Sequence, residues 1–253
     1  MLAQELGMIK ALWWRDMLRL AKERSRWVGV VIQPLLVWIF IGYGVNASFG
    51  TSEQNYLQYF FPGIMVMSIL FTTIYATMSI IEDRSMGFLQ AVLVAPGSRA
   101  SLVFGKILGV TSIGLIQSAV FLALAPWAGY SYGNISWFGV TLLLTVSLMG
   151  FTAMNFSFAW VINSTQGYHA IMNVLLIPLW MLSGAIFPTG PTWLKDIMLF
   201  NPMTYVVKGL RSTLSGHVSW NETCAPLLIL FIFSLLTFYW AIRVCSRNKS
   251  QNS

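Results

Sequence analysis

Charged side chains are scarce in this chain of 253 residues: they make up 9% of it, while hydrophobic residues make up 57%. A soluble domain carries roughly 25% charged residues, so the composition excludes an ordinary soluble protein. It predicts an all-α integral membrane protein, because lipid offers the backbone no hydrogen-bond partner and helices satisfy their own. Cysteine is almost absent as well. Cys224 and Cys245 flank opposite ends of the last apolar run, which excludes a disulfide between them.

Motifs for nucleotide binding and catalysis are also missing. Lys106 follows Gly105, but the next residue is Ile107 and the preceding Gly97 lies at the wrong distance, so the phosphate loop GxxxxGK[ST] is absent. No cluster of His, Cys and carboxylates suggests a metal site, and no Ser/His/Asp set suggests hydrolysis. We therefore expect a chain that is not an enzyme and that binds no metal or cofactor itself.

Six apolar runs are long enough to cross a bilayer, which takes about 20 apolar residues per helix. They are residues 27–45, 59–81, 107–127, 135–162, 168–187 and 225–242. Their centres hold no Asp, Glu, Lys or Arg, so a proton- or sodium-driven carrier would lack its usual intramembrane groups. We predict one six-span transmembrane domain over residues 27–253.

The basic residues predict the orientation, because Lys and Arg are retained on the cytoplasmic side. With both termini inside, twelve of them are cytoplasmic and three are outside. The inside group is Lys10, Arg15, Arg19, Lys22, Arg24, Arg26, Arg84, Arg99, Lys106, Arg243, Arg247 and Lys249, and the outside group is Lys195, Lys208 and Arg211. The net charge of +7 therefore reflects topology, and no nucleic-acid partner is expected.

Residues 1–26 are predicted to form an amphipathic helix at the membrane interface. Apolar side chains recur at spacings of three and four, and a basic stripe follows the same spacing beside them. We expect the apolar face in the acyl boundary, the basic stripe toward lipid headgroups, and a local pair between Asp16 and Arg19. A plain lipid anchor and a gating element both fit. The residues assigned to this helix are Trp13, Arg15, Arg19, Lys22 and Arg26.

The segment 82–109 connects the second and third runs. It opens with three consecutive charges, continues with an apolar patch around Phe88 and Leu89, and breaks at Pro96 and Gly97. Such a segment is too short and too charged to span a bilayer, yet its apolar face is too large to lie idle in water. It is typical of a short helix at the membrane surface that is offered to a soluble partner.

The stretch 188–223 is predicted to form an outer helical hairpin between spans five and six. Two short helices fit residues 192–200 and 202–214, with Asn201 as the N-cap of the second and Pro202 in its first turn. A re-entrant hairpin and a helix pair resting on the bilayer surface are both compatible; the apolar composition favours the re-entrant form. The residues assigned to the hairpin are Trp193, Asn201, Pro202 and Tyr205.

Aromatic and polar side chains inside the runs are candidates for lining a translocation path suited to an amphipathic substrate. Aromatic side chains in membrane spans more often belong to helix packing or to membrane-interface belts, and polar ones more often form interhelical hydrogen bonds. The path candidates are Trp38, Tyr43, Phe71, Tyr75, Asn155 and Trp180.

The order of these parts resembles the permease subunit of ABC-2 type exporters, over nearly the whole chain. The motif E-D-R-x-x-G-F-L-x-x-x-L-V-A-P-x-S-R-x-x-x-x-x-G-K-I-L-G from Glu82 to Gly109 carries most of the resemblance, and N-P-M-T-Y at 201–205 adds to it. The resemblance implies a dimer of six-span permeases, each a copy or a relative of the other, that works with a cytoplasmic ABC ATPase holding the ATP and Mg. It also implies a bacterial inner membrane and an amphipathic substrate such as a drug, lipid or lipid-linked glycan.

The resemblance further implies that the helix between spans two and three, about residues 82–99, couples the permease to the ATPase. The residues it assigns to coupling are Glu82, Asp83, Arg84, Gly87, Phe88 and Leu89, with Pro96 and Arg99 closing the element. The alternative function is a membrane-embedded lipid-modifying enzyme. Its only candidate groups are His169, His217 and Glu222, which are scattered along the chain.

Overall fold

The computed structural model describes residues 2–22, 24–48, 56–94, 97–186 and 192–247, and within these ranges it contains helices and no strand. Five of the described helices are long and apolar enough to cross a membrane. They are α3 (Tyr56–Ser85), α5 (Arg99–Ala123), α6 (Trp137–Val161), α7 (Thr165–Trp180) continued by the π-helical turn η2 (Met181–Ala185), and α10 (Ala225–Arg247) preceded by η3 (Trp220–Cys224). They confirm the last five predicted runs as apolar helices.

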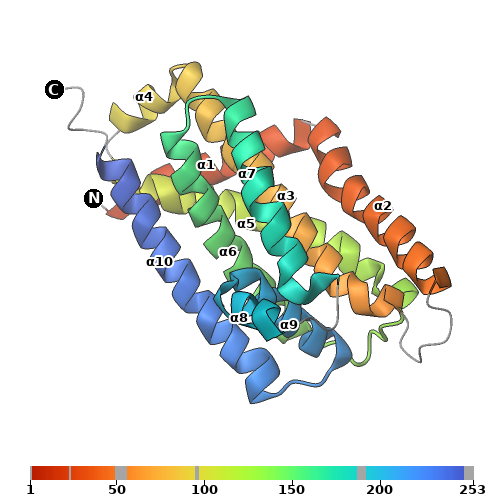
Figure 1. Cartoon of the computed structure of the whole chain (residues 1–253). Coiled ribbons are helices and arrows are strands. Elements are labelled where there is room, and N and C mark those ends of the chain that lie inside the picture. Colours follow the sequence, from red (N-terminus) through yellow and green to blue (C-terminus); the bar gives the residue numbers. More distant parts are fainter. Residues whose placement is uncertain (1, 23, 49–55, 95–96, 187–191, 248–253) are drawn as a thin grey trace.

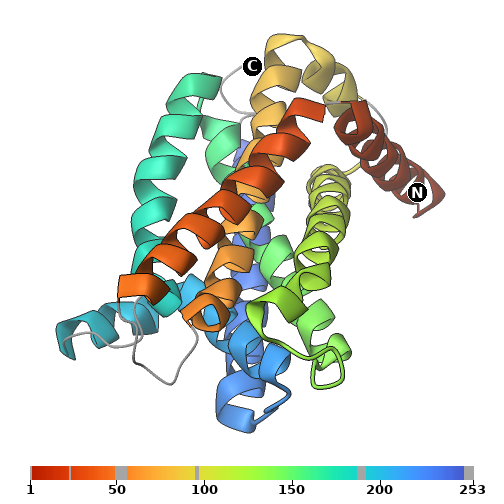
Figure 2. The ribbon, with the colours of Figure 1, turned by 90° about the vertical axis from the view of Figure 1, so that its right-hand side faces the viewer.

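The first predicted run lies in α2 (Arg24–Ser48), whose described apolar part is the shorter stretch Gly29–Val45. A sixth span therefore stays a prediction. Figures 1 and 2 show that the long helices run between two ends of one bundle. One end, called here the α4 end, holds α1 (Leu2–Lys22), α4 (Phe88–Val94) and the C-terminal end of α10. The opposite end, called the α9 end, holds α8 (Thr192–Phe200), α9 (Pro202–Ser215) and η3.

Helix α3 is the centre of the bundle, and it packs against α2, α5, α6 and α7. Several of its polar side chains bond neighbouring helices: Thr73 Oγ1 accepts from Asn155 Nδ2 at 2.9 Å, and Thr77 Oγ1 bonds the hydroxyl of Tyr168 at 2.7 Å. Thr72 likewise bonds the amide of Gln117. These contacts match the interhelical hydrogen bonds that hold apolar helices in register where water is absent.

The two helices predicted after the fifth run are confirmed. Helix α9 begins at Pro202, and the Asn201 side chain accepts from the backbone N–H of Met203 at 3.0 Å, as an N-cap does. Tyr205 fixes the turn by donating from its hydroxyl to the carbonyl of Leu199 at 2.7 Å. The backbone of Trp193 lies in α8, and its side chain is outside the described residues.

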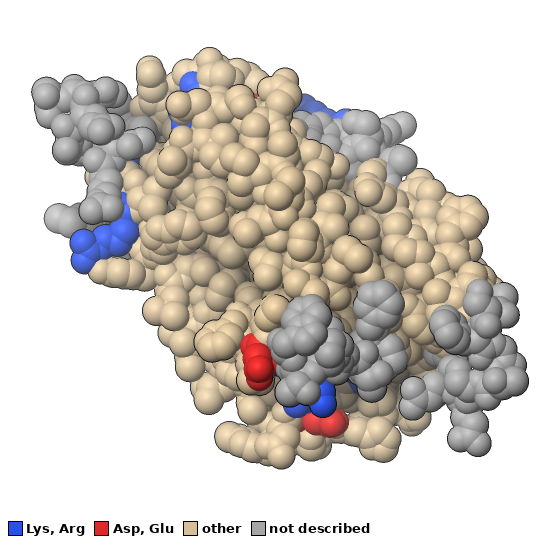
Figure 3. All heavy atoms as spheres, viewed as in Figure 1, with Lys and Arg blue, Asp and Glu red and all other residues tan. Residues whose placement is uncertain are grey.

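Charged side chains on the face drawn in Figure 3 gather near the two ends, and a broad uncharged surface lies between them. The long helices expose large apolar side chains, for example Val174 in α7 at 77% and Leu236 in α10 at 64%. A surface like this is unfavourable in water and favourable in lipid. The arrangement is that of a multi-pass membrane protein.

Candidate functional site

Helices α1, α3 and α5 meet at the α4 end, and two glycines of α5 make the approach of α1 close. A Cβ atom on Gly105 would lie 3.2 Å from the Cα of Ile9, and one on Gly109 would lie 3.1 Å from the Cβ of Asp16. The GxxxG spacing of these glycines therefore serves contact between α5 and α1, since small residues let helix backbones approach. Trp13 adds a hydrogen bond across the same contact, from its Nε1 to Ser112 Oγ at 3.0 Å.

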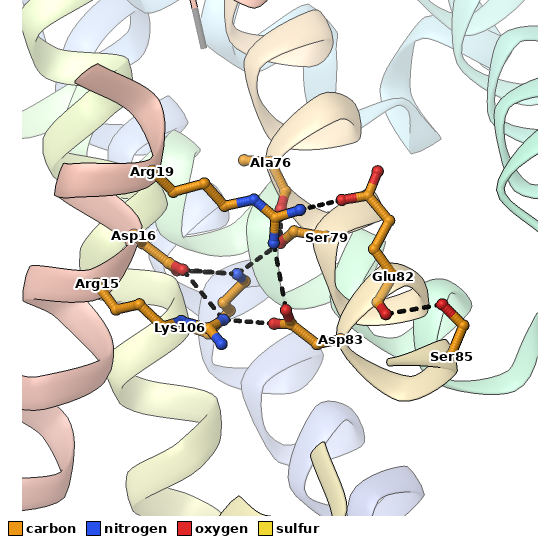
Figure 4. A network of polar contacts seen from close by, with 9 residues as sticks. All are labelled: Arg15, Asp16, Arg19, Ala76, Ser79, Glu82, Asp83, Ser85 and Lys106. Carbon is orange, nitrogen blue, oxygen red and sulfur yellow. Dashed lines mark hydrogen bonds and ion pairs between the residues drawn. The ribbon is translucent and has the colours of Figure 1, made fainter. Parts of the chain in front are cut away.

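Six charged side chains from these three helices form one network, called here the three-helix charge cluster and drawn in Figure 4. Its members are Arg15, Asp16 and Arg19 of α1, Glu82 and Asp83 of α3, and Lys106 of α5. Three are acidic and three are basic, so the cluster is neutral as a whole. It links the N-terminal helix to the end of the central helix.

The deepest pair of the cluster joins Lys106 to Asp16. The Lys106 Nζ lies 2.9 Å from Asp16 Oδ2, donates to Oδ1 at 3.0 Å, and donates to Ser79 Oγ at 2.6 Å. The two charged side chains are only 7% and 6% exposed. A charge buried this far is tolerated only when it is paired and hydrogen-bonded, so each side chain holds the other in place.

The outer layer of the cluster ties the arginines of α1 to the carboxylates of α3. Arg15 and Arg19 both bond Asp83, the latter through Nη1 at 3.2 Å, and Arg19 also bonds Glu82. The side chains of the two arginines are 29% and 23% exposed. The end of α3 is thereby fixed to α1 before the chain turns into α4.

Arg84 points to a different helix. Its guanidinium donates to the backbone carbonyls of Ala159 at 2.9 Å and Trp160 at 2.6 Å, and to the side chain of Asn163 at 2.8 Å. These carbonyls belong to the last turn of α6, where unpaired carbonyls carry partial negative charge. The three consecutive charges thus connect the end of α3 to α1 on one side and to α6 on the other.

Helix α4 follows a turn at Gly87, whose φ of 75° lies in the left-handed region that glycine adopts without strain. Leu89 is buried, while Phe88 is 39% exposed, and the Arg15 guanidinium lies 4.1 Å from the centre of the Phe88 ring. A groove of about 520 Å³ runs between α1 and α4, with Phe88 and Val92 on one wall and Met8 and Leu12 on the other. Phe88 is therefore a partly exposed apolar side chain of α4 that lies beside an arginine of the cluster.

The N-terminal part of α1 is held to the start of α5 by Glu5. Its carboxylate accepts from the backbone N–H of Ser98 at 3.1 Å, from Ser98 Oγ at 2.8 Å, and from Ser101 Oγ. The hydrogen bonds from Ser101 and then from Ser98 lower the pKa of Glu5 below its ordinary value. Ser98 is also the N-cap of α5, so one serine both caps a helix and anchors another.

The structure places the residues predicted for coupling in three settings. Glu82, Asp83 and Arg84 are engaged within the chain, whereas Gly87, Phe88 and Leu89 form the turn and the start of α4. Arg99 is the first residue of α5. Pro96 lies outside the described residues.

Residues Leu2–Lys22 form the predicted helix, but two of its basic side chains are directed differently from the expectation. Arg15 and Arg19 are directed to the carboxylates of α3 and not to lipid headgroups, because the end of α3 lies within reach. The predicted pair between Asp16 and Arg19 is wrong, since Asp16 pairs with Lys106 and lies 3.5 Å from Arg15. Lys22 is exposed, and the side chain of Arg26 is outside the described residues.

Most of the path candidates serve packing within the bundle. Trp38 and Trp180 are each 5% exposed and donate from Nε1 to the carbonyls of Leu57 at 3.1 Å and Gly63 at 2.7 Å. Asn155 is fully buried. The remaining candidates are Phe71, which is buried, Tyr43, which is 62% exposed, and Tyr75, whose hydroxyl lies 3.3 Å from His169 Nε2.

Of the three groups considered for an enzyme, the structure brings only His217 and Glu222 to the same cavity. His169 lies in α7 and bonds Tyr75 and Asn173, whereas His217 and Glu222 lie at the α9 end. Among the described residues no group of three or more His, Cys, Asp or Glu is placed to hold a metal.

The known proteins that this chain resembles are transporters or permeases. A family profile described as "ABC-2 type transporter" matches residues 8–215. The transport permease ycf38 of Cyanophora paradoxa is 29% identical, over 88% of this chain and 84% of its own. The daunorubicin resistance ABC transporter permease protein DrrB1 of Streptomyces coeruleorubidus is 23% identical, over 88% of this chain and 82% of its own. The linearmycin resistance permease protein LnrN of Bacillus subtilis is 25% identical, over 70% of this chain and 46% of its own.

Proposed function

Because this chain belongs to the ABC-2 type transporter family, we propose that it pairs with a second permease to form the translocation path of an ATP-driven exporter. The chain itself is a transport permease subunit and not an enzyme. The energy source is a separate cytoplasmic ABC ATPase that binds ATP and Mg, since this chain lacks the phosphate loop. The partner permease is a second copy or a related chain.

The observation that carries this proposal is the partly exposed apolar side chain of Phe88 on α4, a helix that the three-helix charge cluster holds in place. Phe88 is 39% exposed on a short helix whose neighbour Leu89 is buried, so the helix is anchored on one side and open on the other. Asp83 and Arg15 fix its root to α1, and Arg84 fixes it to α6. Motion applied at α4 would therefore reach three helices of the bundle at once.

We place the α4 end in the cytoplasm and the α9 end outside, in a bacterial inner membrane. The excess of basic residues near α1, α4 and the end of α10 supports this orientation. In this arrangement α2 is the first of six spans in chain order, and α8 with α9 forms the outer hairpin. Exposed apolar side chains on α8, among them Phe200 at 90%, support a re-entrant or membrane-resting position for the hairpin.

The substrate class that fits best is an amphipathic molecule such as a drug, a lipid or a lipid-linked glycan. Two of the relatives are named for resistance to daunorubicin and to linearmycin, which supports a drug-like cargo. Tyr43, exposed on α2, is the path candidate best placed to meet such a cargo at the surface of the protomer. The polar cluster of Tyr75, His169 and Asn173 supplies hydrogen-bonding groups between α3 and α7.

Truncation of Phe88 tests the coupling assignment. We expect Phe88→Ala to leave the protein inserted but to weaken co-purification of the ATPase by roughly 2 kcal/mol, the scale of a buried aromatic anchor. A loss of binding in Phe88→Ala could come from lost apolar surface or from the lost contact between the Phe88 ring and the Arg15 guanidinium. Phe88→Leu separates these two causes, because it keeps apolar surface and loses only the ring contact. Phe138→Ala is the matched control, since Phe138 is 80% exposed on α6 toward the α9 end.

The decisive measurement is the yield of ATPase that co-purifies from membranes in neutral detergent, identified by its phosphate-loop peptides. ATPase recovered at wild-type yield from Phe88→Ala and Leu89→Ala, with transport unchanged, would make α4 a membrane-surface linker. In that case the transport permease assignment would stand and the coupling assignment would fall.

A further inference from the structure

A cavity of about 410 Å³ lies at the α9 end, away from the charge cluster. It is bordered by α3, η2, α8, α9 and the chain after α9, and we call it the α9 cavity. The lining residues that matter are Tyr59, Gly184, Lys208, Arg211, His217 and Glu222. Its volume falls within the range of about 300–1,000 Å³ that is usual for small-molecule sites.

Arg211 is held at the wall of this cavity without a carboxylate. Its guanidinium lies 4.0 Å from the centre of the Tyr59 ring, and its Nη2 lies 3.4 Å from the carbonyl oxygens of Tyr59 and Gly184. Its Nε is buried and has no hydrogen-bond partner among the described residues. All the partners that the structure gives this cation are neutral, and a buried donor left unpaired costs free energy that a further acceptor would recover.

The side chain of Arg211 is preorganised by its contacts with η2 and Tyr59. Gly184, at the end of η2, has a φ of 78°, and a Cβ there would lie 2.7 Å from Met198 Cε. This left-handed turn presents its carbonyl to two donors, the Tyr59 hydroxyl at 2.9 Å and Arg211 Nη2. The arginine is therefore oriented by the backbone of η2 and by the ring of Tyr59 before any ligand arrives.

Lys208 lies one turn before Arg211 and lines the same cavity. Residues three apart share a face of a helix, so two like charges stand side by side, which is unfavourable unless an anion joins them. Lys208 is exposed and forms no ion pair with any residue that the structure describes. Glu222 borders the cavity but is not within ion-pair distance of either cation, and His217 contributes a further basic ring.

The topology makes these cations unusual. Only three basic residues are predicted outside the membrane, Lys195, Lys208 and Arg211, and two of the three line this one cavity. Basic residues are otherwise retained on the cytoplasmic side. Lys208 and Arg211 face one cavity at the outer membrane surface, and neither is paired with a carboxylate of the described chain. This arrangement indicates that the cavity binds an anion.

We propose that the α9 cavity binds a phosphate group, and that its source is the headgroup of a phospholipid in the outer leaflet. Arginine and lysine are the side chains that recognise phosphate, the former through parallel N–H donors. Met198 and Val207 give the cavity an apolar wall, and Leu199 and Phe200 of α8 are 63% and 90% exposed beside it. A lipid with its phosphate at Arg211 would lay its glycerol and upper chains against these residues, as lipids do at basic pockets between helices. The proposal rests on the orientation proposed above, with the α9 end outside, and does not depend on coupling to an ATPase.

Lipid binding to the purified full-length chain tests the proposal. The protein in neutral detergent is titrated with phosphatidylglycerol, with diacylglycerol, which lacks the phosphate, and with inorganic phosphate, and bound lipid is counted by native mass spectrometry. We expect Arg211→Gln and Lys208→Gln each to weaken phosphatidylglycerol binding about tenfold or more, the scale of one lost charge-assisted hydrogen bond. Arg211→Lys should lose less, and Lys195→Gln, an equal charge change on α8, should lose nothing.

The titrations with phosphatidylglycerol and with inorganic phosphate distinguish the two possible sources of the phosphate. Phosphatidylglycerol that resists displacement by excess inorganic phosphate supports a lipid headgroup, whereas displacement, with inorganic phosphate binding in an Arg211-dependent way, supports a phosphate site filled from solution. Lys208→Gln keeps the test valid if Arg211→Gln fails to fold, because Lys208 is exposed. The proposal is overturned if diacylglycerol binds as tightly as phosphatidylglycerol, if Lys208→Gln binds like wild type, or if Lys195→Gln loses as much.

Discussion

Lys106→Met removes one charge from a pair whose side chains are 7% and 6% exposed and whose Nζ and Oδ2 atoms lie 2.9 Å apart. At this distance the attraction is about 6 kcal/mol for an effective dielectric constant of about 20. Most of it is offset by the cost of taking both ions out of water, so the pair adds little net stability. Removing one partner is different, because the other charge stays buried alone, and such changes cost about 3–5 kcal/mol.

The structure predicts an asymmetry between the two partners. Lys106→Met leaves Asp16 with the Arg15 guanidinium at 3.5 Å, so its cost should lie near the lower end, about 3 kcal/mol. Asp16→Asn leaves the Lys106 ammonium with the neutral Ser79 hydroxyl and no carboxylate among the described residues, so its cost should lie near the upper end, about 5 kcal/mol. The double variant Asp16→Leu/Lys106→Met removes both charges and should return to within about 1 kcal/mol of wild type.

Thermal unfolding in detergent measures these changes, and Lys195→Met on the exposed surface of α8 is the control. For a protein of this size 1 kcal/mol shifts Tm by about 2–4 °C, so the single variants should lose about 6–20 °C. The reasoning is refuted if either single variant shifts Tm by less than about 2 °C, or if the double variant is as unstable as the two losses added. A double variant that is stable but inactive in transport would show that the charges serve motion as well as folding.

The remaining predictions concern orientation, the hairpin and the N-terminal contact. A cysteine reagent that cannot cross the membrane should label Asn134→Cys from outside and should not label Ser98→Cys, because the α4 end is placed in the cytoplasm. Asn201→Ala should remove about 1 kcal/mol of local stability from α9 and lower transport without preventing assembly, which hydrogen exchange of α9 and a transport assay would measure. The pKa of Glu5 is lowered in the folded protein, so its contribution is complete above the ordinary carboxyl range and is lost as pH falls through the lowered pKa. Proteolysis of α1 should therefore quicken in acid for wild type, and Glu5→Gln should be sensitive already at neutral pH.

Each of these predictions has an outcome that contradicts it. Labelling of Ser98→Cys from outside would reverse the orientation, and with it the assignment of the α9 cavity to the outer leaflet. Transport at the wild-type rate by Asn201→Ala would favour a passive surface hairpin. Equal proteolysis of wild type and Glu5→Gln at neutral pH would mean that the bonds to Ser98 and Ser101 do not hold α1.

The sequence by itself determined the class of protein, five of the apolar helices and the start of α9. Hydropathy over about 20 residues and capping by Asn201 with Pro202 are local properties, so they survive without knowledge of the fold. The motif from Glu82 to Gly109 likewise carried the family resemblance, which the match over residues 8–215 then bore out.

Only the tertiary structure decided how the charges are used. Asp16 could equally pair with Arg19 on its own helix, and the close approach of α1 to Gly105 and Gly109 is what brings Lys106 to it instead. Local spacing gives every charged residue several acceptable neighbours, and burial selects among them, because a charge removed from water must find the partner that the packing provides. Packing likewise decides the use of Trp38 and Trp180, which composition alone would place along a path. Both lie inside the bundle, where each buried indole N–H donates to a backbone carbonyl that the packing provides.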